Sequence, residues 1–279
     1  SDDQGIRVES RRYPRLQKLS SDSLYYTQAQ IREVVEYARD RGIRVVPEFD
    51  MPGHSTAWFV AYPQYASAPG PYTIARNWSG SPAVFDPTRE SVYRFINGFI
   101  GEMSTLFPDA YWHIGGDEVN ATQWKQSARI QKFMAAHHLA DNAALQAYFN
   151  QRLSRILISH HKRMIGWDEI LHPDLPRTTV VQSWRGTKYL GQAVSQGFSG
   201  ILSAPYYLDA MKSGEQMYLA DPLAGDSTLT PEEASRVLGG EACMWAELVS
   251  TGSIDSRIWP RLAAIAERFG DLHPPLTAQ

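Results

Sequence analysis

Stretches with helical periodicity alternate along the chain with short apolar runs typical of buried strands. Apolar spacing predicts helices over residues 27–41, 86–106, 122–137, 143–161, 188–196 and 256–269. Apolar runs predict strands over residues 43–49, 111–115, 163–167, 178–184, 200–204 and 237–245. Repeated strand–loop–helix units are typical of a parallel sheet covered by helices. The fold class is therefore α/β.

Residues at its two ends support the first predicted helix, 27–41. Thr27 is a suitable N-cap for the helix that follows it, and Gly42 is a suitable stop. The stretch from Asp50 to Asp86 is rich in Pro, Gly and Ser and is too long for a plain connection. It is a candidate binding loop.

Polar and aromatic residues follow the predicted strands at their C-terminal ends. These residues are Asp50, Asp117, Glu118, Trp167, Asp168, Trp184, Tyr207, Asp209, Trp245 and Glu247. A (β/α)8 TIM barrel keeps its active site at this end of its strands. Six strands can be counted, with Asp2 and Asp3 at the mouth of a possible seventh. We therefore expect residues 1–279 to form one partial TIM-barrel catalytic domain that lacks its first one or two strands.

Two adjacent carboxylates, Asp117 and Glu118, follow the apolar run 111–114 and the pair Gly115-Gly116. Adjacent acids repel, so a pair at a strand end suits chemistry in which one is protonated while its neighbour is ionised. The alternative is a surface loop with two solvated acids. The strand before the pair and the aromatic residues at neighbouring strand ends favour the catalytic interpretation.

An aromatic residue and a carboxylate are spaced by two residues in Tyr207-Leu208-Asp209 and again in Trp245-Ala246-Glu247. In an extended segment such residues point the same way, which would offer a sugar both a flat apolar wall and an ionised acceptor. A half-buried strand with an exposed acid explains either motif alone. Trp167 and Trp184 at equivalent strand ends strengthen the sugar-site interpretation, although any single Trp is more often a core residue.

Two histidines lie next to these strand ends. His54 could orient a catalytic carboxylate, and His113 could support the acids from within the strand; each could also be purely structural. The sequence has no His-Glu-x-x-His pattern, no Gly-x-Ser-x-Gly and no Gly-x-Gly-x-x-Gly after a first strand. We expect no metal site, no serine nucleophile and no cofactor.

Composition narrows the remaining classes. The formal net charge is -3 without long runs of one sign, which argues against a nucleic-acid or membrane partner. Hydrophobic residues make up 43%, enough for a large core. The single cysteine, Cys243, excludes an internal disulfide and is expected in the core.

Several motifs, in order along most of the chain, resemble those of family 20 glycoside hydrolases, the β-N-acetylhexosaminidases. The most specific is His113-Ile114-Gly115-Gly116-Asp117-Glu118-Val119. The others are Ser1-Asp2-Asp3-Gln4-Gly5, Val46-Pro47-Glu48-Phe49-Asp50-Met51-Pro52-Gly53-His54, Gly166-Trp167-Asp168-Glu169, Trp184, Tyr207-Leu208-Asp209, Trp245-Ala246-Glu247, Trp259-Pro260-Arg261 and Ala266-Glu267-Arg268.

The resemblance implies a retaining, substrate-assisted reaction at a terminal non-reducing N-acetylhexosamine. Glu118 would be the general acid and then the base. Asp117 would hold the 2-acetamido group of the substrate, whose carbonyl oxygen attacks the anomeric carbon. His54, with either Asp2 or Asp3, would form a relay that tunes Glu118.

The remaining implied roles concern substrate binding. Tyr207 would donate a hydrogen bond to the acetamido oxygen, three tryptophans would wall the pocket, and two acids would accept from sugar hydroxyls. The tryptophans are Trp167, Trp184 and Trp245, and the acids are Asp209 and Glu247. The resemblance also favours a secreted or periplasmic location.

The chain departs from the family pattern in one respect. The first-strand arginine that grips sugar hydroxyls in this family is absent, as is the small domain that often precedes the barrel. A further polypeptide segment could complete the barrel. The alternative to the enzyme is a non-catalytic sugar-binding fragment or pseudo-enzyme.

Overall fold

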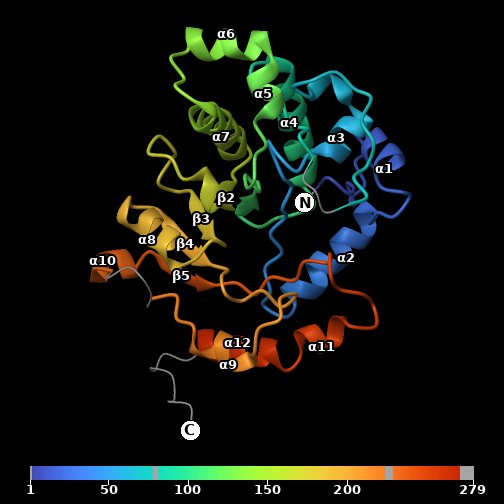
Figure 1. Ribbon diagram of the computed structural model, residues 1–279. Helices are drawn as coiled ribbons and strands as arrows, with labels where there is room; N and C mark the ends of the chain where they lie inside the picture. The colour runs from blue at the N-terminus through green and yellow to red at the C-terminus, as the bar shows by residue number, and fades with distance from the viewer. Residues whose placement is uncertain (1, 78–80, 224–228, 271–279) are drawn as a thin grey trace. The chain divides into compact units, whose positions relative to one another are not determined.

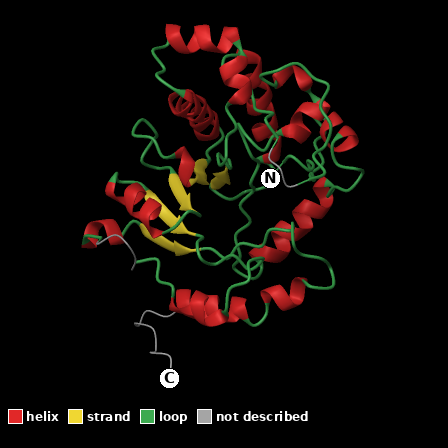
Figure 2. Ribbon diagram, in the orientation of Figure 1, coloured by secondary structure: helices red, strands yellow, loops and turns green. Residues whose placement is uncertain are grey.

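The computed structural model describes residues 2–77, 81–223 and 229–270 (Figures 1 and 2). The chain divides into two compact units. The first unit comprises residues 1–176 and the second residues 177–279. Short strands alternate with helices in both units. This alternation is the α/β pattern that the sequence predicted.

The first unit contains two strands, seven helices and two 3₁₀ turns among its described residues. They are α1 (Arg15–Leu19), α2 (Gln28–Arg39), α3 (Thr56–Ala61), η1 (Pro63–Tyr65), α4 (Glu90–Met103), β1 (Tyr111–His113), α5 (Thr122–Gln126), α6 (Ala128–Ala136), α7 (Asn142–Ser159), β2 (Arg163–Trp167) and η2 (Asp168–Ile170). β1 and β2 are parallel neighbours, with Trp112 opposite Met164. Thr27 caps α2 in a capping box with Gln30, as its position before the helix predicted.

The predicted buried strand over residues 43–49 is wrong in its first half. The Phe49 N–H donates to the His113 carbonyl and the His113 N–H donates to the Pro47 carbonyl, so this end of the segment runs along β1. No described residue pairs with Ile43 to Val46 as a neighbouring strand. Ile43 is 58% exposed and Val46 is 37% exposed. An apolar run becomes a buried strand only where a neighbouring strand satisfies its backbone hydrogen bonds. Here β1 does so only from Pro47 onwards.

Aromatic side chains dominate the core of the first unit. Trp58 packs edge-on against Phe99 with ring centroids 4.7 Å apart, and Phe49 stacks on Trp112 at 5.5 Å. Both tryptophans are almost completely buried. Such pairs contribute about 0.5–1.5 kcal/mol each beyond simple burial. For these tryptophans the core interpretation holds, and they fix the segment that leads to Asp50.

The second unit contains three strands and five helices among its described residues. They are β3 (Val180–Ser183), α8 (Thr187–Ser195), β4 (Ser199–Leu202), α9 (Gly214–Leu219), α10 (Pro231–Ala234), β5 (Val237–Gly240), α11 (Ile254–Ile258) and α12 (Arg261–Gly270). β3, β4 and β5 are parallel in that order. α8 covers β3 and β4, and α9 lies beside α12 (Figure 1). Leu190, Leu202 and Tyr206 belong to the core cluster of this unit.

Three predicted elements are interrupted. The helix over 122–137 breaks at Ser127, whose side chain caps α6 by accepting from the Ile130 N–H. The helix over 256–269 breaks before Pro260, because proline lacks an N–H and disfavours the helical conformation of the preceding residue. The predicted loop over 50–86 contains α3 and η1, and its residues 78–80 lie outside the described part.

Within the described residues no helix is long and apolar enough to cross a membrane.

Candidate active site

The candidate site begins where β1 ends and the chain turns sharply through Gly115, Gly116, Asp117 and Glu118. Gly115 has φ 67°, Gly116 has φ 91° and Glu118 has φ 47°, all in the left-handed region. Non-glycine residues avoid this region, and strained backbone of this kind concentrates at functional sites. A Cβ on Gly115 would lie 1.8 Å from Asp50 Oδ1. Gly115 therefore lets the turn pass directly against Asp50, which follows the segment that runs along β1.

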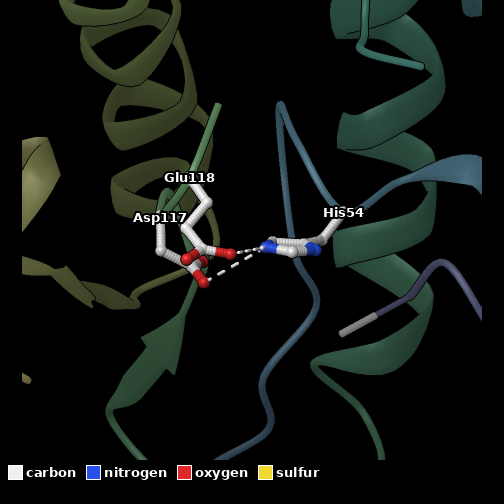
Figure 3. A group of neighbouring side chains, drawn as sticks. All are labelled: His54, Asp117 and Glu118. Atoms are coloured by element: carbon white, nitrogen blue, oxygen red, sulfur yellow. Dashed lines mark ion pairs between the residues drawn. The ribbon is translucent and has the colours of Figure 1, made fainter. Parts of the chain in front are cut away.

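His54 faces both carboxylates of this turn (Figure 3). Its Nε2 lies 3.4 Å from Asp117 Oδ2 and 3.4 Å from Glu118 Oε2. His54 itself has φ 47°, so two non-glycine residues in the left-handed conformation meet across one contact. The side chain of Asp117 is 19% exposed and that of Glu118 is 59% exposed. Both acids therefore contact His54, but Glu118 is much more exposed to solvent than Asp117.

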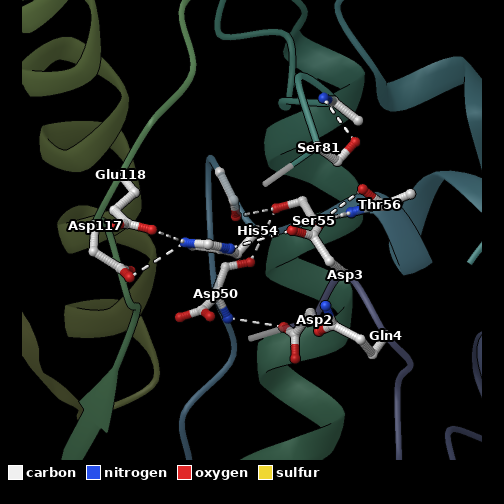
Figure 4. Close-up of polar contacts among 12 residues, drawn as sticks. Asp2, Asp3, Gln4, Asp50, His54, Ser55, Thr56, Ser81, Asp117 and Glu118 are labelled. Carbon is white, nitrogen blue, oxygen red and sulfur yellow. Dashed lines mark hydrogen bonds and ion pairs between the residues drawn. The ribbon is translucent and has the colours of Figure 1, made fainter. Parts of the chain in front are cut away.

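Asp3 holds the far side of the imidazole (Figure 4). Its Oδ2 lies 3.2 Å from His54 Nδ1, and its Oδ1 accepts a hydrogen bond of 2.9 Å from the Thr56 N–H. Asp2 turns elsewhere, because its Oδ2 accepts from the Asp50 N–H and from Trp58 Nε1. The sequence left open which aspartate partners His54, and the geometry selects Asp3.

Electrostatics make His54 a cation. Burial, the largest influence, lowers the pKa of His54, but hydrogen bonds to Asp117 and Asp3 outweigh it and raise the pKa to about 11. Burial likewise raises the pKa of Asp3, yet bonds from His54 and Thr56 bring it below its usual value. His54, Asp117 and Glu118 present ligand atoms within 4.8 Å of one another, a spacing that a metal ion could use. In its protonated form the imidazole donates from Nε2 towards both carboxylates.

A second layer of carboxylates lies behind this contact. Burial raises the pKa of Asp2 to about 7. Burial also raises the pKa of Asp50 well above its usual value, and the charges of Glu48 and Asp117 raise it further. Burial raises the pKa of Glu48 too, but its interaction with His113 lowers it to about 2. Glu48 is therefore the ionised member of this layer, and Asp50 tends to hold a proton.

Glu48 joins two residues that the sequence singled out. Trp167 Nε1 donates a hydrogen bond of 3.1 Å to Glu48 Oε1, and His113 Nδ1 lies 3.3 Å from the same oxygen. His113 Nδ1 also accepts from the Gly115 N–H at 3.0 Å, so of the two alternatives left open for His113 this contact favours support of the turn. Trp167 is 3% exposed at the end of β2. Sequence reasoning missed the role of Glu48, because its partners Trp167 and His113 lie far from it along the chain.

Gln146 is a further residue that sequence reasoning missed. From α7 its Nε2 donates a hydrogen bond of 2.7 Å to the Gly116 carbonyl. Nothing in the spacing of a helical glutamine signals such a contact with a turn thirty positions away.

The remaining predicted site residues lie in the second unit, each at or after a strand end. Trp184 follows β3, and Tyr207 forms an isolated parallel bridge with the buried Cys243. Asp209 and Glu247 lie in turns, so neither motif is extended over its full length, contrary to the expectation of a shared strand face. β4 and β5 end early, at Leu202 and Gly240, and the chain bends beyond them. The functional roles of these residues stay predictions.

Comparison with known proteins adds independent evidence. A family model for the catalytic domain of glycosyl hydrolase family 20 matches residues 1–270. The chain is 38% identical to β-hexosaminidase subunit alpha of Rattus norvegicus, over 96% of this chain and 52% of that protein. It is 37% identical to a β-hexosaminidase of Porphyromonas gingivalis, over 96% of this chain and 38% of that protein. The chain thus spans about half or less of the length of these relatives.

Solved structures show the same fold. The chitobiase of Flavobacterium johnsoniae matches with a TM-score of 0.93 and 44% identity, over 96% of this chain and 42% of that one. An exo-β-N-acetylglucosaminidase of Vibrio harveyi in complex with N-acetylglucosamine matches with a TM-score of 0.85 and 29% identity, over 96% and 48%. These likenesses confirm the predicted fold class, an incomplete (β/α)8 barrel.

Proposed function

The chain belongs to glycosyl hydrolase family 20, and on that premise we propose that its protein is an exo-acting β-N-acetylhexosaminidase. The observation that carries the proposal is the contact of His54 with Asp117 and Glu118, backed by Asp3. The β-hexosaminidases and the chitobiase among its relatives support terminal N-acetylglucosamine or N-acetylgalactosamine as substrate, including the ends of chitin fragments.

Glu118 is the proton donor and acceptor of the proposed reaction. In the first step its proton passes to the glycosidic oxygen as the bond from that oxygen to the anomeric carbon breaks. In the second step it takes a proton from water, which attacks the same carbon. Its 59% exposed side chain leaves room for a leaving group and for that water. The His54 cation, 3.4 Å away, favours the carboxylate that forms when the proton leaves.

Asp117 orients the nucleophile, which belongs to the substrate. The acetamido oxygen bonds to the anomeric carbon and gives an oxazolinium-like intermediate, which the attack of water opens with retention of configuration. Asp117 Oδ1 is buried and has no hydrogen-bond partner among the described residues, so it is available to accept from the acetamido N–H. A carboxylate here also favours the positive charge of the intermediate. Holding the internal nucleophile in place lowers the entropic barrier.

Substrate contacts follow from the family motifs. Tyr207 donates to the acetamido oxygen, while Trp167, Trp184 and Trp245 offer apolar walls to the acetyl methyl and the sugar face. Asp209 and Glu247 accept from sugar hydroxyls and so recognise a terminal residue. Asp2 holds the fold around the site in place and makes no substrate contact in this proposal. Its carboxylate already accepts hydrogen bonds from the Asp50 N–H and from Trp58 Nε1.

We also propose that a further polypeptide segment completes the barrel. Exposed apolar side chains at Ile43 and Val46, beside a backbone with no described neighbouring strand, support this. The same observation favours the competing candidate, a sugar-binding chain without turnover. Binding of N-acetylglucosamine without hydrolysis would favour that candidate. Hydrolysis should then also be absent with a longer chain and at higher protein concentration.

The deciding experiment compares wild type with Glu118→Gln on two aryl N-acetylglucosaminides. One substrate has an activated leaving group and the other a poor one. If Glu118 is the acid, kcat/KM should fall by about 100-fold or more for the poor leaving group and far less for the activated one. Glu36→Gln, an exposed glutamate on α2, is the matched control and should behave as wild type. Equal losses on both substrates would contradict the assignment.

A thiazoline mimic of the cyclised intermediate tests the role of the acetamido group. It should inhibit competitively and much more tightly than N-acetylglucosamine, because it resembles the transition state. Absence of inhibition by an active enzyme would rule out acetamido participation.

A further inference from the structure

The backbone of the Gly115–Glu118 turn cannot hold itself in place. Three of its four residues have left-handed φ values, so beyond the Gly115 carbonyl the turn continues neither a helix nor strand β1. Every support for its peptide groups must come from elsewhere in the fold. The position of both acids depends on those supports.

Three hydrogen bonds provide them. The Gly115 N–H donates to His113 Nδ1 at 3.0 Å, and the Trp167 N–H donates to the Gly115 carbonyl at 2.9 Å. The third bond, of 2.7 Å, runs from Gln146 Nε2 to the Gly116 carbonyl. The first two fix Gly115, and among the described residues only the Gln146 bond reaches the next peptide group.

That next peptide group is the one that carries Asp117. The Gly116 carbonyl and the Asp117 N–H belong to one rigid plane, so rotation of this carbonyl swings the Asp117 side chain. Two glycines precede the plane and offer little steric resistance to such rotation. Ile170 packs against Gly116 closely enough that an added Cβ would lie 2.4 Å from Ile170 Cγ2. Ile170 therefore blocks one direction of movement, while the Gln146 bond defines the angle.

Gln146 is well placed for this task. It lies on α7, an 18-residue helix whose Leu145, Ala147 and Phe149 are buried in the first unit. Its backbone is therefore rigid, and its half-buried side chain reaches the turn from a firm base. The distance of 2.7 Å is at the short end for an N–H···O bond.

We propose that Gln146 is a positioning residue of the hexosaminidase reaction. It acts through the Gly116 carbonyl on Asp117, and through Asp117 on the acetamido group. The inference rests on the proposed function. It assigns to an α7 side chain that touches no reacting atom a specific share in aligning the internal nucleophile.

The test uses the full chain in three variants. Gln146→Leu keeps the approximate volume and removes the donor. Gln146→Glu keeps the shape and donates only when protonated. Gln151→Leu is the matched control, because Gln151 is a glutamine on the same helix whose Nε2 lies 3.4 Å from Asp174 Oδ2, away from the turn.

Alignment of the nucleophile should be lost without loss of the fold. We expect Gln146→Leu to lower kcat/KM on an activated aryl N-acetylglucosaminide by roughly tenfold or more, since small misplacements of reacting groups are costly. The inhibition constant of the thiazoline should rise by a similar factor, while affinity for N-acetylglucosamine stays within about twofold. For Gln146→Glu, the ratio of its kcat/KM to that of wild type should rise as the pH falls from about 7 towards the ordinary glutamate pKa near 4.3.

Each outcome bears on the inference. A wild type that neither hydrolyses the substrate nor binds the thiazoline defeats the proposed function and this inference with it. If wild type is active and Gln146→Leu matches Gln151→Leu in kcat/KM and in thiazoline affinity, Gln146 is not a positioning residue. Equal weakening of thiazoline and N-acetylglucosamine binding, or a Gln146→Glu ratio that does not change with pH, indicates general destabilisation and overturns it too.

Discussion

Replacement of Gly115 by alanine is the most direct probe of how the fold places its acids. Gly115 has φ +67°, and the added methyl carbon would lie 1.8 Å from Asp50 Oδ1 and 2.6 Å from Asp50 Cγ. Ordinary contact begins at 3.4 Å, so the turn and the Asp50 carboxyl must separate by about 1.6 Å. Asp50 is 2% exposed, its Cα would lie 3.1 Å from the new methyl, and the bond to Asp2 holds its backbone. The turn is therefore the part that has to move.

Two costs add up in this variant. The left-handed conformation costs an alanine about 1–2 kcal/mol, and forcing a methyl group into a packed interior costs about 1–3 kcal/mol more. We expect the free energy of unfolding to fall by about 2–5 kcal/mol. A displacement above 1 Å should also reduce kcat/KM by about 100-fold, because Asp117 and Glu118 move with the turn.

Gly42→Ala separates the two costs. Gly42 has φ +71°, but no atom lies within 4 Å of the place that a methyl group would take there, so only the conformational cost of about 1–2 kcal/mol applies. Urea unfolding would give both stabilities, and hydrolysis of an aryl N-acetylglucosaminide would give both activities. A Gly115→Ala variant that is no less stable than Gly42→Ala and keeps kcat/KM within about twofold of wild type would contradict this prediction.

Two further predictions concern the first unit. His54 has a folded pKa of about 11 against 6.5 when unfolded, so its contribution to stability is complete below about pH 6.5 and is lost as the pH rises towards 11. Urea unfolding at about pH 6, 8 and 10 should show a steeper decline for wild type than for His54→Gln, and parallel declines would refute the ion-pair assignment. Asn150 on α7 is fully buried, and neither atom of its amide has a partner among the described residues. Asn150→Leu should raise the free energy of unfolding by about 1–3 kcal/mol, whereas a loss of stability would show that the amide is satisfied after all.

The sequence predicted the elements whose patterns are local. The strand over 163–167 has the predicted bounds, and the helix over 143–161 is α7 with its ends shifted by one or two residues. The predicted strand was wrong over residues 43–46, because an apolar run does not reveal whether a neighbouring strand is present. The shared strand face predicted for the motif 207–209 was also wrong, because where a strand ends depends on its partner strand and not on its own alternation.

The candidate site divides in the same way. Asp117, Glu118 and His54 could be identified because their motifs mark strand ends, and the structure brings their side chains together. The choice of Asp3 over Asp2 could not, since adjacent residues differ only in which way the backbone turns them. Gln146 gave no signal because its partner is a backbone carbonyl, which every residue possesses.

The unequal exposure of the two acids has a consequence for how such an enzyme would diversify. In the proposed reaction Asp117, which is 19% exposed, reads a part of the substrate that every N-acetylhexosaminide shares. Glu118, which is 59% exposed, would meet the leaving group, the part that differs from one substrate to the next in that proposal. New leaving groups can then be accepted by altering residues around Glu118, while the acetamido requirement stays fixed by the core. Selection for new substrates would act on the exposed residues around Glu118, and selection for folding would preserve the buried residues around Asp117.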